Sequence, residues 1–134
     1  MAFKDDISIN TIIGKGSTIS GNVKVNGFVR VDGDIDGDLE TDGNILIGED
    51  ARIRGNVVAN SVTVGGAIIG DIQALDGVRL LSTSLVRGDI LSHKVQIEDS
   101  AFFHGHCISI KDNENYQQTA AEYLQEKAIK EKVI

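Results

Sequence analysis

The chain of 134 residues suits one domain of ordinary size, and 20 acidic against 13 basic side chains give it a net charge of −7. It contains 15 glycines, no proline or tryptophan, four phenylalanines and two tyrosines, and 18 isoleucines with 12 valines against 8 leucines. A core of β-branched side chains disfavours a helical bundle, and the acidic balance makes nucleic acid an unfavourable partner.

Residues 1–10 are expected to form a short N-terminal arm ahead of the first repeated motif. They contain no apolar segment typical of a secretory signal, and no run in the chain approaches the roughly 18 apolar residues of a membrane span. Cys107 has no second cysteine to pair with, so the expected location is a reducing cytoplasm. The apolar side chains of the arm could cap the first turn of the domain, touch a membrane or remain mobile.

A motif of five residues then recurs six times between residues 19 and 107: an apolar residue, any residue, glycine, any residue and usually an aliphatic residue. Its copies lie 16, 18, 15, 18 and 17 positions apart and centre on Gly21, Gly37, Gly55, Gly70, Gly88 and Gly105. Apolar residues at alternate positions flank each copy, which is typical of short strands with one buried face. The repeat therefore predicts strands separated by bends over residues 11–110, with no helix before residue 111.

A repeat near 17 residues is too short for a propeller blade and contains no helix for a leucine-rich horseshoe, so we expect each repeat to make one turn of a coil. This predicts an all-β solenoid, a parallel β-helix of about six turns whose equivalent positions stack about 4.8 Å apart. Stacking would place Asp36 beside Arg54 and Lys24 beside Glu40 on the outer surface. The repeat does not determine the hand of the coil.

Residues 111–134 have a different character, with no glycine and many Ala, Glu, Gln and Lys residues. Asp112 or Asn113 is placed as an N-cap, and Glu126 and Lys130 have the spacing of a helical ion pair. We therefore predict a C-terminal α-helix with one face formed by Tyr116, Ala120, Tyr123, Leu124 and Ala128. This helix is expected to cover the open last turn or to dock on a neighbour.

Two motifs resemble ligand-binding loops without completing them. The acidic run 32–39 matches the first eight positions of a calcium-binding loop, but Gly43 stands where a bidentate glutamate is required and no helices flank it. The loop 13–19 lacks the spacing of a phosphate loop and any following helix. Its near copy at 47–53 replaces Lys15 by an acid, so we interpret this loop as architectural.

Three histidines suggest an alternative hypothesis, in which the chain is an enzyme. His93, His104 and His106 lie within 14 residues, and a spacing of two places the last two on one side of a strand. They would fit a left-handed, trimeric hexapeptide-repeat enzyme with a histidine-based metal or catalytic site. No further ligand pattern accompanies them, and stacking places His106 next to Asp89, so we favour surface pairing and predict no metal, cofactor or catalytic site. Cys107 falls in an inward column and is expected to be a small core residue.

The two ends of the coil are the remaining candidates for function. A coil of strands exposes unpaired backbone groups on its first and last turns, and these must be capped or used for pairing. Phe103 stands where every earlier copy is Ile or Val, so its ring either plugs the end of the core or forms an apolar face for another subunit. The candidate polymerisation interface comprises Phe102, Phe103, Ile108, Ile110, Ile12 and Ile13.

The order of these motifs over residues 11–110 resembles the bactofilins, a family of polymer-forming bacterial cytoskeletal proteins. The resemblance rests on the repeated Gly-Asp/Asn-aliphatic units and on three runs, IIGKGSTISG at 12–21, VDGDIDG at 31–37 and IEDSAFFHGHC at 97–107. It implies a right-handed, roughly triangular parallel β-helix whose subunits join through their ends into filaments without nucleotide or cofactor.

The resemblance also implies a cytoplasmic scaffold at the inner face of the cytoplasmic membrane that serves cell-shape or cell-wall machinery. Its implied partners are the chain itself as a homopolymer, cell-wall enzymes and other bactofilins, with a peripheral membrane contact at Met1, Ala2 and Phe3. We therefore expect a structural cytoskeletal protein and no enzymatic activity. The alternatives are the trimeric hexapeptide-repeat enzyme and a non-polymerising partner whose C-terminal helix caps the rod or binds another protein.

Overall fold

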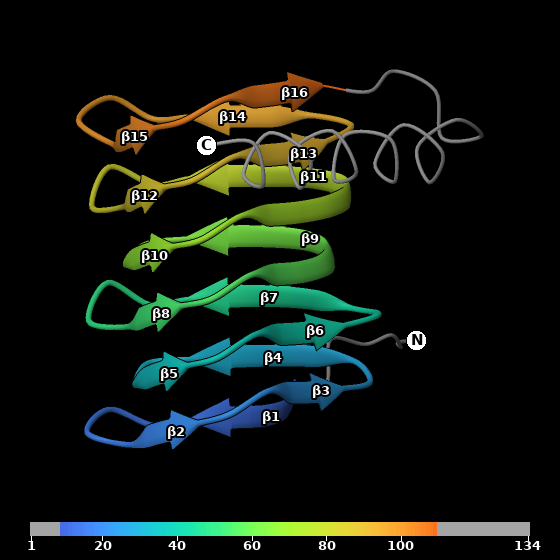
Figure 1. Cartoon of the computed structure of the whole chain (residues 1–134), viewed down its shortest axis with the longest axis vertical. Helices are drawn as coiled ribbons and strands as arrows, with labels where there is room; N and C mark the ends of the chain where they lie inside the picture. Colours follow the sequence, from blue (N-terminus) through green and yellow to red (C-terminus); the bar gives the residue numbers. More distant parts are fainter. Residues whose placement is uncertain (1–8, 110–134) are drawn as a thin grey trace, which may run out of the picture.

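Residues 9–109 of the computed structural model form a rod of stacked turns that contains strands and, within that range, no helix (Figure 1). The strands pair in parallel, each with its equivalents in the neighbouring turns. The predicted all-β solenoid of about six turns is therefore confirmed. Residues 1–8 of the expected arm and the expected helix over 111–134 lie outside the described residues.

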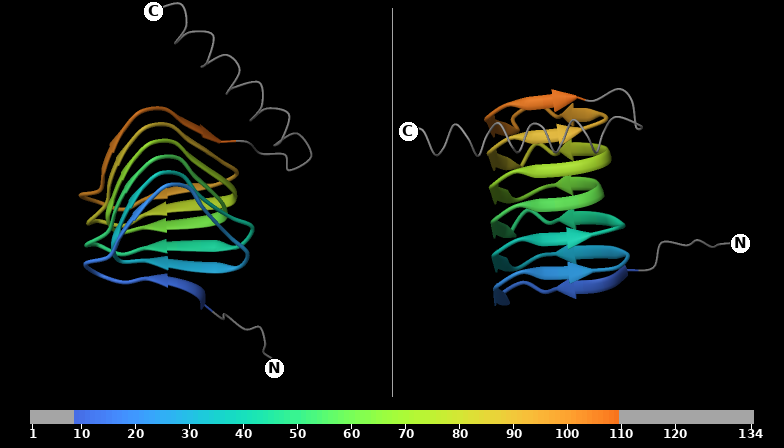
Figure 2. Two further views of the ribbon diagram at one scale, coloured as in Figure 1. Left: turned by 60° about the horizontal axis from the view of Figure 1, so that its bottom comes forward. Right: turned by 45° about the vertical axis from the view of Figure 1, so that its right-hand side comes forward.

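Every turn visits three faces of the rod in the same order (Figure 2). Face 1 carries β1 (Ile9–Ile13), β4 (Phe28–Val31), β7 (Asn44–Ile47), β14 (Val95–Ile97) and the second halves of β9 (Val57–Val64) and β11 (Ile72–Leu80). Face 2 is the six-stranded sheet of β2 (Thr18–Ser20), β5 (Asp34–Asp36), β8 (Arg52–Arg54), β10 (Ala67–Ile69), β12 (Leu85–Arg87) and β15 (Phe102–His104). Face 3 carries the first halves of β9 and β11 together with β3 (Val23–Val25), β6 (Leu39–Thr41), β13 (Ile90–Ser92) and β16 (Cys107–Ser109).

Columns of aliphatic side chains fill the interior, each residue stacked on its own copies. The inward column of face 2 consists of Ile19, Ile35, Ile53, Ile68, Val86 and Phe103. The matching column of face 3 consists of Val23, Leu39, Val57, Ile72, Ile90 and Cys107. One column of face 1 consists of Ile13, Val31, Ile47, Val64, Leu80 and Ile97. In turns two to five the members of these columns are exposed by 2% or less, which accounts for the excess of Ile and Val.

The outer surface also follows the predicted stacking. Lys24 Nζ lies 3.9 Å from Glu40 Oε2 on face 3, and Arg54 Nη2 lies 3.9 Å from Asp36 Oδ2 on face 2. All four side chains are largely exposed, so these ion pairs contribute little to stability. They mainly offset the repulsion between stacked charges.

A short turn joins face 1 to face 2. In the first turn of the rod the Ser17 N–H donates to the Gly14 carbonyl oxygen at 3.1 Å, and the same bond recurs in turns three, five and six. Lys15 Nζ lies 3.5 Å from Asp50 Oδ2, at the corresponding corner two turns away. The loop at 13–19 is thus a repeated corner of the coil, as expected from its copy at 47–53.

The bend between face 2 and face 3 depends on glycine. Gly70 has a φ of +150°, and a Cβ there would lie 2.0 Å from the Gly55 carbonyl oxygen in the turn before. Gly21 occupies the equivalent bend of the first turn with a φ of +120°, but a Cβ on it would meet nothing within 4 Å. Gly21 is therefore required only for its backbone angle, whereas Gly70 is required both for its backbone angle and because no space is left for a Cβ.

We expect Gly70→Ala to lower the free energy of unfolding by about 3 kcal/mol or more, because it adds a backbone clash to the strain of positive φ. Gly21→Ala is the matched control and should lose only about 1–2 kcal/mol from strain. Urea unfolding of dilute protein, followed by circular dichroism, measures both changes. Equal losses for the two variants would contradict the steric explanation.

Candidate functional site

Both ends of the rod present the apolar interior of the coil. In the last turn Ile97 is 48% exposed, whereas its copy Leu80 in the turn before is 0% exposed. Phe103 is likewise partly exposed although its copy Val86 is fully buried. In the first turn the partly exposed apolar members of the inward columns are Ile19, Val23 and Val25. We call these two surfaces the N-terminal and the C-terminal end face.

The end faces also carry unpaired backbone edges. Among the described strands, β1, β2 and β3 pair only with strands of the second turn, and β14, β15 and β16 only with strands of the fifth. Each end therefore displays a row of N–H and C=O groups around an apolar centre. Such an edge is a template for another strand at the ordinary spacing of a sheet.

The structure divides the candidate interface residues between the end faces and the sides. Ile13 and Phe103 belong to inward columns at opposite ends of the rod, where Ile13 is 5% exposed. Side chains at three other candidate positions point outward by the alternation of their strands, and these are Ile12, Phe102 and Ile108. Ile110, the membrane candidates Met1, Ala2 and Phe3, and the helix face of Tyr116, Ala120, Tyr123, Leu124 and Ala128 lie outside the described residues.

Sequence reasoning overlooked Ile97 and misplaced Cys107. The column of Ile97 was visible in the alternation Val95/Ile97, but its importance follows only from its position in the last turn. Cys107 stacks on Ile90 as expected, yet it is exposed instead of buried, because no described turn lies above it. Partial burial nevertheless raises the pKa of its thiol above the usual value.

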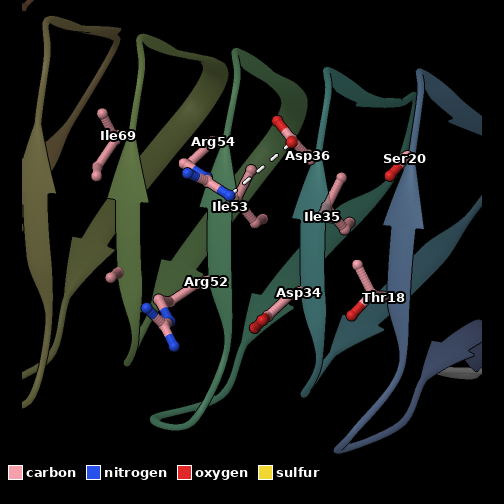
Figure 3. A pocket seen from close by; sticks show the side chains of 10 residues that line it. Thr18, Ser20, Asp34, Ile35, Asp36, Arg52, Ile53, Arg54 and Ile69 are labelled. Atoms are coloured by element: carbon pink, nitrogen blue, oxygen red, sulfur yellow. Dashed lines mark ion pairs between the residues drawn. The ribbon is translucent and has the colours of Figure 1, made fainter.

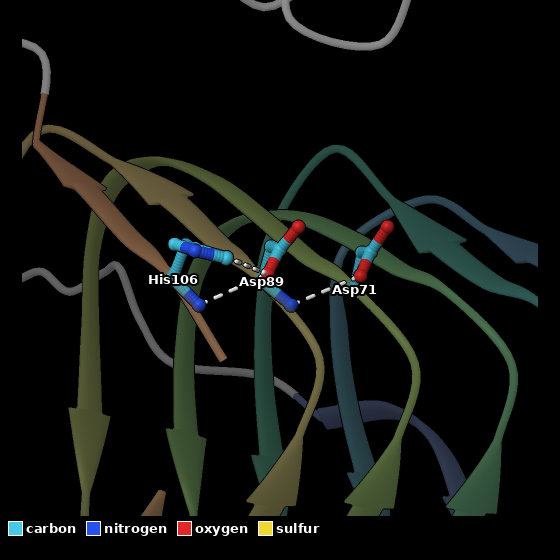
Figure 4. A network of polar contacts seen from close by, with 3 residues as sticks. All are labelled: Asp71, Asp89 and His106. Carbon is cyan, nitrogen blue, oxygen red and sulfur yellow. Dashed lines mark hydrogen bonds and ion pairs between the residues drawn. The ribbon is translucent and has the colours of Figure 1, made fainter. Parts of the chain in front are cut away.

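A ladder of Asn and Asp side chains connects the turns at the start of face 3 (Figure 4). In each link a side-chain Oδ1 accepts the backbone N–H of the equivalent residue in the next turn, with N···O distances of 2.8–3.1 Å. The ladder consists of Asn22, Asp38, Asn56, Asp71, Asp89 and His106. Stacking predicted the surface pair of His106 and Asp89, but not that Asp89 and its copies accept backbone hydrogen bonds from the next turn.

The histidines do not form the cluster that the enzyme hypothesis requires. His104 ends β15, and His106 lies beyond the bend at Gly105, so the expected shared strand face is absent because the chain turns between them. His106 Nδ1 lies 3.3 Å from Asp89 Oδ1, which confirms the expected surface pairing. Within residues 9–109, no three His, Cys, Asp or Glu side chains are arranged to hold a metal ion.

The acidic run 32–39 is spread over the side of the rod. A shallow groove of about 340 Å³ lies on the outer surface of face 2, lined by Asp34 and Asp36 on β5 and by Arg52 and Arg54 on β8 (Figure 3). The strand register places Asp34 opposite Arg52 and Asp36 opposite Arg54. These charges balance within the groove, so it does not concentrate carboxylates for a cation.

Substitutions at Asn56 test the ladder. Asn56→Ala removes the acceptor of the Asp71 N–H, which lies 3.0 Å away, and should lower the free energy of unfolding by about 1 kcal/mol. Asn56→Asp keeps the acceptor but adds a carboxylate between Asp38 and Asp71. It should therefore lower the free energy of unfolding at low salt, and the loss should shrink as added salt screens the repulsion. Urea unfolding at two salt concentrations measures both effects. A stability of Asn56→Asp that does not respond to salt would contradict this account.

These features define a structural β-solenoid, a rod whose apolar interior and unpaired strand edges are open at its two ends. The profile of the bactofilins, described as polymer-forming cytoskeletal, matches residues 11–108, and the chain belongs to this family. Bactofilin BacP of Myxococcus xanthus (strain DK1622) is 29% identical over 96 residues, which are 72% of this chain. The chain spans 40% of the length of that relative.

Two solved structures share the fold. The cytoskeletal bactofilin BacA, determined by solid-state NMR, has a TM-score of 0.67 and 34% identity over 75% of this chain and 96% of its own. A phenylalanine-to-arginine mutant of the bactofilin from Thermus thermophilus has a TM-score of 0.64 and 26% identity over 68% of this chain and 100% of its own. In the described part of this chain, no helical segment has the length and hydropathy to cross a bilayer.

Proposed function

We propose that this chain is a structural cytoskeletal subunit that assembles end to end into filaments. The observation that carries the proposal is the contrast between equivalent residues, since Ile97 is 48% exposed in the last turn and Leu80 is 0% exposed one turn earlier. A second subunit stacked on the end would restore to the last turn the cover that every inner turn already has. Burial of apolar surface contributes about 25 cal/mol per Å², so closing the end faces favours assembly.

The assembly needs no nucleotide and no enzymatic activity in this proposal. Stacked ends continue the parallel backbone pairing and the inward columns of the rod, so the interface uses the same interactions as the fold. The loop that most resembles a phosphate site is a corner of the coil, where Ser17 donates to Gly14. Polymerisation would therefore depend on protein concentration and salt.

The sides of the filament would serve as the scaffold. In this proposal, outward positions recruit cell-wall enzymes or other bactofilins in the cytoplasm, because outward residues are free to vary while inward residues must stack. The N-terminal residues Met1, Ala2 and Phe3 are the proposed peripheral contact with the inner face of the cytoplasmic membrane. Co-sedimentation of filaments with anionic vesicles, before and after Phe3→Ser, tests this contact; binding unchanged by the substitution would contradict it.

Neighbouring phenylalanines test end-to-end assembly. Phe103→Arg places a charge on the C-terminal end face. In the free subunit water hydrates this charge. In a filament the next subunit would remove that water and supply no opposite charge, which costs several kcal/mol. We expect folded subunits that no longer form filaments in negative-stain electron microscopy. Circular dichroism checks that the subunit remains folded.

Phe102→Arg is the matched control, because Phe102 is 52% exposed and points outward from the same strand. It should leave filaments intact. Filaments of Phe103→Arg with the normal morphology would contradict the proposal for this end of the rod. Loss of filaments in Phe102→Arg alone would move the interface to the side.

Labelling of Cys107 provides an independent test. Cys107 is exposed on the C-terminal end face, but partial burial raises the pKa of its thiol above the usual value, so folded subunits should react with maleimide more slowly than denatured chains at the same pH. In filaments the reaction should slow further, by about tenfold or more, because the neighbouring subunit covers the thiol. Mass spectrometry of samples quenched at intervals measures the rates.

The control for labelling is a cysteine on the side of the rod. Arg54→Cys in a Cys107→Ser background places the thiol at a largely exposed outward position on face 2, in the third turn and away from both ends. Its rate should be similar in subunits and in filaments. An equal rate for Cys107 in both states would show that the C-terminal end face stays open on assembly.

A further inference from the structure

The outer side of face 2 is apolar in the turns nearest the C-terminal end. Ile69 on β10 is 48% exposed, Leu85 on β12 is 38% exposed and Phe102 on β15 is 52% exposed. The strand register stacks Leu85 on Ala67 and Phe102 on Leu85, and Ile69 lies two residues beyond Ala67 on the same strand. We call these four residues the face 2 patch. Exposed apolar side chains that adjoin over several strands are typical of an interaction site.

The patch is unlike the other sides of the rod in the part of the chain that the structure describes. Ile12 on face 1 and Val58 on face 3 are also exposed, but their neighbours in the turn beside them are Arg30 and Glu40. Ile97 belongs to the C-terminal end face. Stacking of subunits would not cover the patch, because its side chains point away from the axis of the rod.

The charged side chains around the patch all have one sign. The outward positions of β8, β10, β12 and β15 hold three of the chain's five arginines and no acidic residue, although the chain has 20 acidic side chains. These positions are Arg52, Arg54, Ala67, Ile69, Leu85, Arg87, Phe102 and His104. Arg54 lies 3.9 Å from Asp36 of the turn below, whereas Arg52 and Arg87 form no ion pair within residues 9–109. The surroundings of the patch are therefore suited to carboxylates.

The edge of the patch is hollow (Figure 3). Ala67 and Ile69 line the groove of about 340 Å³ together with Arg52 and Arg54. Ala67 is much smaller than Arg52 and Leu85, its neighbours in the same column, so a side chain of a partner has room above it. A hollow bordered by arginines suits the side chains of a protein segment better than the flat surface of a bilayer.

A second copy of this chain does not complement the patch. Two patches brought face to face would place arginines against arginines with no carboxylate between them. The outward acidic side chains of face 2, Asp34 and Asp36, stand in the second turn. Antiparallel subunits could pair these acids with the arginines of β8 only in a register that leaves Phe102 uncovered.

We propose that the face 2 patch binds an amphipathic helix of another protein, in which Asp and Glu flank the apolar side chains. Each helical turn advances about 5.4 Å, close to the roughly 4.8 Å between turns of the rod, so a helix along the rod would place successive apolar side chains over Ala67, Leu85 and Phe102. Its carboxylates would reach Arg52 and Arg87, and arginine binds a carboxylate through two parallel hydrogen bonds. The inference rests on the proposed scaffold function and gives that scaffold one docking surface.

Fluorescence anisotropy of labelled peptides with the full-length chain tests this docking. The probe is a synthetic helical peptide with leucines at positions i, i+3, i+4 and i+7 and glutamates on both sides of them. The control peptide has lysine in place of every glutamate. At physiological salt the glutamate peptide should bind at least about tenfold more tightly, although the net charge of −7 on the chain favours the lysine peptide.

Variants of the chain locate the binding. Leu85→Glu should weaken binding of the glutamate peptide at least about tenfold, because it places a carboxylate in the centre of the patch. Val58→Glu is the matched control, since Val58 is also outward and is 36% exposed against 38% for Leu85, and it should bind normally. Arg87→Gln should weaken binding about fivefold or more, whereas Arg79→Gln on face 1 should not. Circular dichroism checks the fold of each variant.

Negative-stain images of the same samples separate this inference from end-to-end assembly. Specific binding of the glutamate peptide supports the docking surface whether or not filaments form, and absent filaments would contradict only the filament proposal. Failure of the glutamate peptide to bind, equal binding of both peptides, or binding that survives Leu85→Glu would each overturn the inference.

Two other results would assign the patch to a different occupant and overturn the inference as well. The first is sedimentation with phosphatidylglycerol vesicles that Leu85→Glu abolishes while the glutamate peptide does not bind, which would indicate a membrane. The second is side-by-side pairing of rods that Leu85→Glu abolishes under the same condition, which would indicate a second copy.

Discussion

Every inner turn of the rod receives its hydrogen bonds and its apolar contacts from copies of itself above and below, at the spacing of neighbouring strands. This constraint explains the columns of Ile and Val, since a side chain in an inward position must fit against its own equivalents. It also explains why Gly70 has no room for a Cβ, because the carbonyl of Gly55 fills that space. The same constraint leaves the first and last turns without backbone partners and apolar contacts on their outer side.

The ends and sides of the rod consequently have different physical roles. At an end, the contacts that stabilise the fold are interrupted, as the exposure of Ile97 shows, and a second copy of the chain is the natural complement. On the sides, the Asn and Asp ladder satisfies backbone N–H groups at each bend, and ion pairs such as Arg54 with Asp36 offset stacked charges. The sides are therefore closed to strand addition and available for other contacts.

Much of the fold was predictable because a repeat converts sequence spacing into spatial stacking. The alternation and the glycine spacing predicted the six turns, and the pairs Lys24 with Glu40 and Asp36 with Arg54 followed from stacking. The candidate site was less predictable. Ile12 and Phe102 share strands with Ile13 and Phe103 but point outward, and the exposure of Cys107 depends on what lies above it.

The sequence by itself determined the parallel coil and its inward columns, because these depend on local alternation and a regular period, and the order of its motifs resembled a polymer-forming family. Only the tertiary structure decided which residues are end and which are side. It showed that side chains in the column after each central glycine accept backbone hydrogen bonds, and that Ile97 is exposed where its copy Leu80 is buried. Burial and hydrogen bonding depend on neighbours about seventeen residues away and beyond, which a local pattern does not contain.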